Sequence, residues 1–181
     1  MFALLLTGPP GAGKTAVLTV LSDLLVADDI RHATVEAEAL TSAHPALEDD
    51  QWIVPVRAIC SVYREFGYEL LLVTATIDGQ DHLEAVLAAI GADRHAVVRL
   101  QADPATLCQR IAEREPDGWP GLDELLAGAH RLAPVIARLN GIALALSTER
   151  EPPETIAERI RNAFPDQLRP ASCSPSSRRR R

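Results

Sequence analysis

The sequence predicts an α/β fold in which a parallel sheet lies between two layers of helices. Short apolar segments alternate with amphipathic helical segments along most of the 181 residues. The segment "ELLLVTATI" (69–77) is apolar without alternation, which is typical of a strand buried on both faces. Strands separated by helices imply right-handed crossovers, and therefore a three-layer α/β/α arrangement around a five-stranded parallel sheet.

The first half of the chain contains three expected strands, and each is followed by a helical segment. The strands are expected at 2–6, 32–40 and 69–77, and the helices at 16–26, 50–66 and within 78–91. The last of these helices follows a turn and ends at Gly91, because glycine accepts the left-handed conformation that closes many helices.

The second half continues the same alternation. Strands are expected at 95–102 and 142–147, and helices at 103–115, 122–139 and 152–164. The helix at 103–115 begins with Asp103 and Pro104, a residue pair that favours the N-cap and the first turn. Asn140 and Gly141 end the helix before the fifth strand.

Length and composition favour one domain, at residues 1–164, with a disordered tail at residues 165–181. The hydrophobic fraction of 47% is sufficient for one core, while the tail is rich in Ser, Pro and Arg. The tail has a net charge of +4, which leaves −11 for the preceding residues. So acidic a body disfavours nucleic-acid binding, except through the tail arginines.

Cysteine usage and hydropathy favour a cytoplasmic protein without a membrane anchor. The three cysteines are far apart and form no Cys/His cluster, so the sequence indicates neither a zinc site nor a disulfide framework. No apolar run reaches the length of a membrane span, and the apolar start of the chain lacks a basic leader. Oligomeric state is left open between monomer and homodimer.

The stretch "GPPGAGKT" (8–15) contains the strongest functional signal. It fits the phosphate-binding pattern G-x-x-x-x-G-K-[ST] and lies between an expected strand and an expected helix. Lys14 is the single lysine among 18 basic residues, and a compact ammonium on a flexible stem suits contact with phosphate oxygens. Thr15 offers a hydroxyl to Mg²⁺. Loop amides and the helix N-terminus complete an anion site, which predicts binding of ATP with Mg²⁺.

Carboxylates near the ends of the second and third strands are candidates for metal and substrate contacts. Glu36 and Glu38 are two residues apart, so in a strand both would point to the same face, in a largely buried setting. One could hold Mg²⁺ through water while the other accepts a proton from a substrate hydroxyl. Asp78 is interpreted as a cap of the following helix, with a metal carboxylate as the alternative.

Arginines and one loop complete the candidate site. Arg110 and Arg114 are four apart on an expected helix, so they share a face and could stabilise a transferring phosphoryl group; surface pairing with Glu113 or Glu115 is the alternative. Arg57 is a candidate clamp for an anionic substrate. The loop "LSTERE", beginning at Ser147, is placed to contact the nucleotide base. The residues expected to bind the nucleotide are Gly8, Pro9, Pro10, Gly11, Ala12, Gly13, Lys14, Thr15, Ala16, Arg110 and Ser147.

These motifs resemble those of small P-loop kinases, including shikimate kinase, gluconate kinase, adenylylsulfate kinase, chloramphenicol phosphotransferase and nucleoside-monophosphate kinases, and of bacterial proteins classed as small P-loop ATPases. "GPPGAGKT" is the specific part, "DPATLCQRIAERE" is similar to the lid-helix region, and "VEAEAL" resembles the carboxylate pair of shikimate kinase. The resemblance covers residues 2–164 and implies the P-loop NTPase fold with sheet order 2-3-1-4-5. It also implies that Glu36 lies on the Mg²⁺ side and Glu38 on the acceptor side.

Two departures from that pattern bear on the substrate. No aspartate directly follows the third strand, and no arginine follows the carboxylates of the second. Both favour a small hydroxylated acceptor over a nucleotide. We therefore expect a phosphotransferase that moves the γ-phosphoryl group of ATP to a small hydroxylated or anionic molecule. The alternatives are a regulatory nucleotide-binding protein with slow hydrolysis and a nucleic-acid-end kinase anchored by the arginine tail.

Overall fold

The structure, a computed structural model, describes residues 1–48 and 51–170. Its sheet has five parallel strands in the order β2-β3-β1-β4-β5. The strands are β1 (Phe2–Thr7), β2 (Ala33–Glu36), β3 (Leu70–Ala75), β4 (Arg94–Gln101) and β5 (Ile142–Ser147). The fold class, the strand count and the strand order are those predicted.

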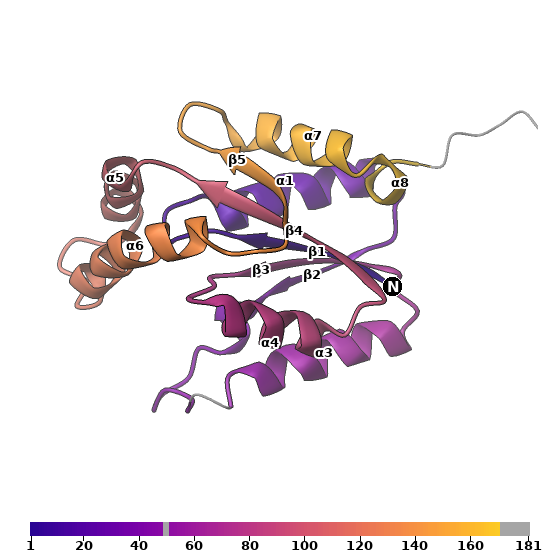
Figure 1. Cartoon of the computed structure of the whole chain (residues 1–181), viewed down its shortest axis with the longest axis horizontal. Helices are drawn as coiled ribbons and strands as arrows, with labels where there is room; N and C mark the ends of the chain where they lie inside the picture. Colours follow the sequence, from indigo (N-terminus) through magenta and orange to yellow (C-terminus); the bar gives the residue numbers. More distant parts are fainter. Residues whose placement is uncertain (49–50, 171–181) are drawn as a thin grey trace, which may run out of the picture.

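Helices cover both faces of the sheet (Figure 1). On one face lie α1 (Lys14–Ala27), α7 (Pro153–Ala163) and the short α8 (Pro165–Leu168), and on the other lie α3 (Ile53–Glu65) and α4 (Gln80–Ile90). Helix α5 (Pro104–Arg114) lies beyond the carboxyl end of β4, and α6 (Leu122–Ala137) returns from there toward β5. Leu132 and Ile136 of α6 pack in the half of the core that α3 and α4 cover. The carboxyl end of the sheet is where ligands bind in open α/β folds.

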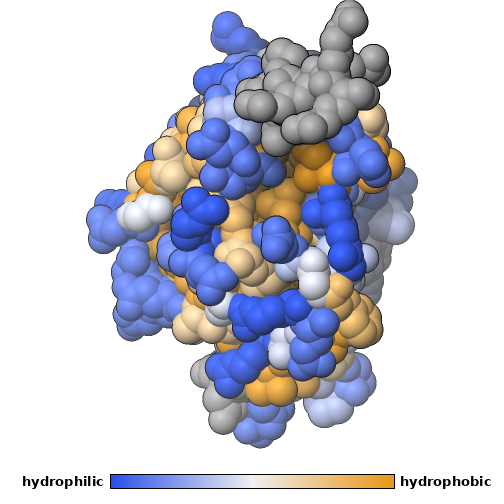
Figure 2. Space-filling model, turned by 90° about the vertical axis from the view of Figure 1, so that its right-hand side faces the viewer, coloured by the Kyte–Doolittle hydropathy of each residue, from blue (hydrophilic) through white to orange (hydrophobic). Residues whose placement is uncertain are grey.

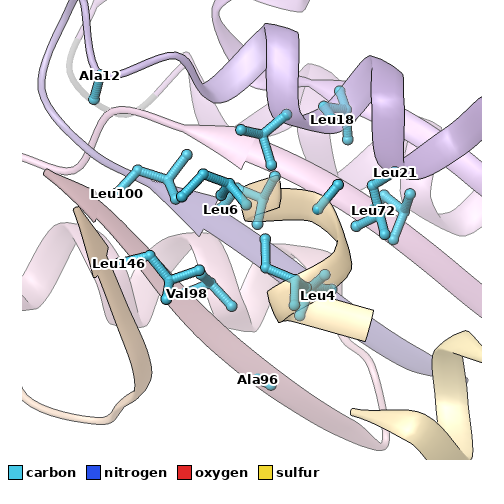
Figure 3. Close-up of a cluster of buried hydrophobic side chains, with 14 of the residues drawn as sticks. Leu4, Leu6, Ala12, Leu18, Leu21, Leu72, Ala96, Val98, Leu100 and Leu146 are labelled. Carbon is cyan, nitrogen blue, oxygen red and sulfur yellow. The ribbon is translucent and has the colours of Figure 1, made fainter. Parts of the chain in front are cut away.

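Leucines of the central strand connect the two halves of the core. Leu4 and Leu6 point to the face covered by α1, where Leu18 and Leu21 pack on them (Figure 3). Leu5, between them, points to the opposite face, among the side chains covered by α3 and α4. Because every residue of β3 is buried as well, its continuous apolar run is explained by burial on both faces.

The expected second strand is too long. Only Ala33–Glu36 pair with β3, and Ala37–Leu40 form one helical turn, α2. Ala37, Glu38 and Leu40 are strong helix formers, so the backbone leaves the extended conformation as soon as its pairing with β3 ends. The prediction that Glu36 and Glu38 point to one face of a strand is therefore wrong, since Glu38 lies in α2.

Most helix boundaries lie within two residues of those expected. Helix α1 begins at Lys14 rather than at residue 16, and α6 ends at Ala137 rather than at 139. Helix α3 begins at Ile53, while Asp50, its expected start, lies outside the described residues. Asp103 caps α5 by accepting a hydrogen bond from the Ala105 amide, as the Asp-Pro pair predicted.

The folded body extends beyond the expected boundary at residue 164. Residues 165–168 form α8, whose Leu168 is fully buried in the core. Buried Arg161 donates to the Leu168 carbonyl and forms an ion pair with Asp28, so α8 is connected to α7 and α1. The expected disorder is corrected for these four residues, and it stays a prediction for residues 171–181, which lie outside the described part.

The opposite end of the molecule, where the strands begin, has a mixed surface. Figure 2 views this end and shows hydrophilic side chains interspersed with smaller apolar areas. None of the described helices combines the length and the apolar character needed to cross a membrane.

Candidate active site

The phosphate-binding loop connects β1 to α1. Gly11 and Gly13 have positive φ angles of 80° and 86°, a backbone region that side chains other than glycine rarely adopt. A Cβ atom at Gly11 would lie 2.6 Å from the Leu107 carbonyl oxygen, so the packing of α5 against the loop also requires glycine. Lys14 is the first residue of α1, so the helix N-terminus opens onto the loop.

Lys14 lies between the loop and the end of β3. Its ammonium donates to the Gly8 carbonyl at 2.9 Å and to the Thr76 hydroxyl at 2.8 Å, and it lies 3.9 Å from a Glu38 carboxylate oxygen. Only 12% of the side chain is exposed. Burial lowers the pKa of Lys14, Glu38 raises it, and nearby Arg114 lowers it further. A phosphate at the loop would supply the negative charge that this ammonium needs.

Thr15 and Glu36 form the second element of the site. The Thr15 hydroxyl donates to a Glu36 carboxylate oxygen at 2.7 Å, and Glu36, the last residue of β2, is half-buried. Hydroxyl and carboxylate oxygens are the donors that Mg²⁺ prefers, with water and substrate phosphates completing its shell. Among the described residues, no group of three or more His, Cys, Asp or Glu side chains is arranged so that it could hold a metal ion. As oxygen donors, Thr15 and Glu36 fit Mg²⁺ bound together with nucleotide phosphates.

Glu38 is held by Thr76, a residue that the sequence did not single out as part of the site. One Glu38 oxygen accepts from the Thr76 amide at 2.7 Å and from its hydroxyl at 2.6 Å. Since the same hydroxyl accepts from Lys14, a continuous chain of hydrogen bonds connects Lys14, Thr76 and Glu38. The Glu38 side chain is 50% exposed, so the expected buried setting is wrong for it. Thr76 directly follows the apolar strand β3, and this position was the one signal in the sequence that could have indicated its place in the site.

These groups line one cavity of about 630 Å³ together with both predicted arginines. Arg110 and Arg114 thus share a helix face, as expected from their spacing. Arg110 donates to the Thr148 carbonyl at 2.6 Å and to its hydroxyl at 3.1 Å. Arg114 also pairs with Glu115, which was the alternative considered for it. The cavity is lined by Pro10, Gly11, Gly13, Lys14, Thr15, Ala16, Glu36, Glu38, Thr76, Arg110, Arg114 and Leu125.

A smaller apolar cavity of about 290 Å³ adjoins it on the β5 side. Thr148, Pro152 and Ile156 line it, and it shares Gly13, Ala16 and Arg110 with the phosphate side. Ser147, the residue expected here, lines a different cavity. Thr148 is buried and also donates to the Ala12 carbonyl. Of the loop predicted to contact the base, Thr148 and not Ser147 lines this cavity, and the contact with the base stays a prediction.

A third cavity, of about 580 Å³, lies on the β2 side, and Glu38 and Thr76 belong to both it and the phosphate side. Its lining residues are Ala37, Glu38, Thr41, Trp52, Ala75, Thr76, Asp78, Asp81, His82 and Ala85. We call it the acceptor-side cavity and the 630 Å³ cavity the phosphate-side cavity. The two meet at Glu38.

Asp78 and Arg57, two further predicted site residues, also lie away from the phosphate-side cavity. Asp78 lines the acceptor-side cavity, where it accepts from His82 at 2.6 Å, and its side chain is 66% exposed. The N-cap of α4 is Gly79, so the interpretation of Asp78 as the helix cap is wrong. Arg57 is exposed on α3 and is not among the residues that line the acceptor-side cavity.

Comparisons with known proteins bear on the fold. No protein-family profile matches the chain, and no curated protein matches its sequence. A sugar kinase from Janibacter sp. HTCC2649 is similar in structure, with 18% identity, a TM-score of 0.67 and coverage of 94% of this chain and 99% of the kinase.

Two further kinases are similar over most of their length. A gluconokinase from Sinorhizobium meliloti 1021 has 16% identity, a TM-score of 0.64 and coverage of 92% of this chain and 93% of its own. The Mycobacterium tuberculosis APS kinase, whose structure contains AMPPNP and APS, has 18% identity and a TM-score of 0.64. The match covers 90% of this chain and 96% of that kinase. At these identities the likeness concerns the fold. The chain therefore has the fold of the small P-loop kinases over about 92% of its length.

Proposed function

We propose that the protein transfers the γ-phosphoryl group of ATP, in the presence of Mg²⁺, to a hydroxyl group of a small molecule. The observation that carries this proposal is the position of Glu38. It lies between a cavity lined by the phosphate loop and a second cavity without loop residues, and it belongs to both. A phosphate donor and a hydroxyl acceptor bound in these cavities would meet at this carboxylate.

The nucleotide side is supported by the loop and by the adjoining apolar cavity. Lys14 and the loop amides would hold the outer phosphates, and the cavity beside Thr148 and Pro152 would receive the base. Arg110, fixed by Thr148, and Arg114 would stabilise the negative charge of the transferring group. Phosphoryl transfer depends mainly on such positioning and electrostatics.

The acceptor side is supported by the hydrogen bonds at Glu38. The Thr76 amide and hydroxyl occupy one oxygen of Glu38, which fixes the carboxylate and leaves the other oxygen for a substrate hydroxyl. Glu38 would accept the hydroxyl proton as the acceptor oxygen attacks phosphorus. Mg²⁺, when bound at Thr15 and Glu36, neutralises phosphate charge. Small molecules are also the substrates named for the kinases with this fold, which include a gluconokinase and an APS kinase.

A regulatory nucleotide-binding protein is the second candidate, and one observation favours it. No carboxylate follows β3 directly, and Asp78 lies beside the acceptor-side cavity instead of the phosphate loop. A protein of this kind would bind ATP tightly and hydrolyse it slowly, whatever small molecule is added.

ADP release from Mg-ATP, measured across a panel of hydroxylated metabolites, nucleosides and sugars, separates the two candidates. A kinase releases ADP much faster with one acceptor, and Lys14→Ala abolishes the increase. If the protein binds ATP tightly but no compound of the panel accelerates ADP release, the regulatory nucleotide-binding protein would be favoured instead. Loss of ATP binding altogether would contradict both candidates.

A further inference from the structure

The acceptor-side cavity is negatively charged. Glu38 in α2, Asp78 before α4 and Asp81 in the first turn of α4 all line it, and no lysine or arginine is among its described lining residues. His82 is the one titratable base there, and it already contacts Asp78 at 2.6 Å. Asp81, in the first turn of α4, forms no hydrogen bond or ion pair with the described residues.

The sequence around the cavity reinforces this charge. Its lining residues come from the segments 37–56 and 70–93, and neither segment contains a lysine or an arginine. Lys14, on the phosphate side, donates its hydrogen bonds to Gly8 and Thr76. Glu38 has Lys14 at 3.9 Å and Asp78 has His82 at 2.6 Å, but no cation lies beside Asp81 among the described lining residues. A carboxylate or phosphate on the acceptor would therefore face more negative than positive charge in this cavity, which is unfavourable.

An aromatic side chain, Trp52, also lines the acceptor-side cavity. Trp52, at the start of α3, packs against His82 with ring centroids 4.4 Å apart and an interplanar angle of 64°. Among aromatic side chains, tryptophan attracts cations most strongly through its ring face. An aromatic ring beside carboxylates is a chemical combination that binds ammonium groups and disfavours anions.

From this combination we infer that the acceptor is a cationic amino alcohol or amino sugar, held by its ammonium at Asp81, Asp78 and Trp52, with a hydroxyl directed to Glu38. This inference rests on the proposed function and narrows it. In the transfer, Glu38 takes the hydroxyl proton and the acceptor oxygen forms a bond to the γ-phosphorus. The bond from that phosphorus to the β–γ bridging oxygen breaks, and ADP leaves. The ammonium group is unchanged.

Two matched series of probes test the charge preference. The first is glucosamine, glucose and gluconate, and the second is serinol, glycerol and glycerate, so that each series carries a positive, a neutral and a negative member. ADP release is measured with each probe, and binding of each probe to the protein with Mg-ADP is measured separately by calorimetry. We expect the amine of at least one series to exceed its neutral counterpart about tenfold in both assays, and the acid to be weakest.

Two single-residue variants test whether Asp81 is responsible for the preference for the amine. Asp81→Asn should reduce the ratio between the responses to the amine and to its neutral counterpart about tenfold. Glu84→Gln, which removes the same charge from α4 at an exposed position outside the cavity lining, should leave this ratio intact. Melting temperatures of both variants establish that they are folded.

The outcomes separate this inference from the proposed function. Transfer to a neutral or acidic probe in preference to the amine would support the kinase and overturn the inference. Amine binding that Asp81→Asn weakens, without any ADP release, would support the charge preference and contradict phosphoryl transfer. Equal or absent responses to all six probes in both assays would overturn the inference.

Discussion

The phosphate-side and acceptor-side cavities differ in charge although they share Glu38 and Thr76. The phosphate side combines Lys14, Arg110 and Arg114 with two glutamates, whereas the described lining of the acceptor side has three carboxylates and no lysine or arginine. In the proposed reaction, the cations of the phosphate side would neutralise the phosphates of the nucleotide. The acceptor side would have no such requirement, so its charge could serve to select the substrate.

Lys14→Ala is expected to have the largest effect, because it removes the central cation of the phosphate side. ADP release should fall on the order of 10³-fold, since charge stabilisation of a transferring phosphoryl group is worth that much. Steady-state kinetics with saturating acceptor measure the loss. The melting temperature should change little, because burial already disfavours the Lys14 charge and lowers its pKa.

A second variant at this position tests geometry against charge. Lys14→Arg keeps a cation, but its planar guanidinium does not match the hydrogen bonds to Gly8 and Thr76. Activity should stay near that of Lys14→Ala. Substantial recovery with arginine would mean that the phosphate side needs charge alone.

Glu38→Gln tests the carboxylate shared by the two cavities. Loss of the proton acceptor should lower kcat roughly 10²-fold with little change in the KM for ATP. The glutamine oxygen can still accept from Thr76, so the local structure is retained. An unchanged kcat combined with a raised acceptor KM would show that Glu38 binds the acceptor without taking its proton.

The two cavities also differ in how far the sequence predicts them. The phosphate side depends on a contiguous motif and on helix spacing. Short-range patterns were therefore enough to predict that Lys14 and Thr15 lie close to Arg110 and Arg114, which line the same cavity. The acceptor side is assembled from segments far apart in sequence. Trp52 and His82 meet only because α3 and α4 pack together, and no local pattern contains that contact.

Errors in the sequence analysis have a similar origin. Glu38 was expected in a strand because its segment alternates, but pairing with β3 ends at Glu36, and helix propensity then decides the backbone. The loop after β5 is similarly sensitive to position, because Thr148 lines the cavity beside the phosphate loop while the predicted residue, Ser147, lines a different cavity. A shift of one residue therefore changes which side chain enters a cavity.

Glu36→Gln should sharpen the distinction between metal and acceptor roles. Glu36 contacts Thr15 on the phosphate side and is absent from the lining of the acceptor-side cavity. The Mg²⁺ concentration for half-maximal activity should therefore rise about tenfold, while the acceptor KM stays constant. A Mg²⁺ titration at fixed ATP measures this. A raised acceptor KM with an unchanged Mg²⁺ requirement would exchange the assigned roles of Glu36 and Glu38.

Thr76→Val should have the smallest effect, because it removes only the hydroxyl that connects Lys14 to Glu38. The Thr76 amide still holds Glu38, so the loss is about 1 kcal/mol, or roughly fivefold in kcat. Thr76→Ser restores the hydroxyl and should restore kcat. A melting temperature equal to that of the wild type would establish that Thr76→Val acts on catalysis and not on folding. A kcat that stays reduced in Thr76→Ser would contradict a role for the hydroxyl, and the two cavities would then be coupled only through Glu38 itself.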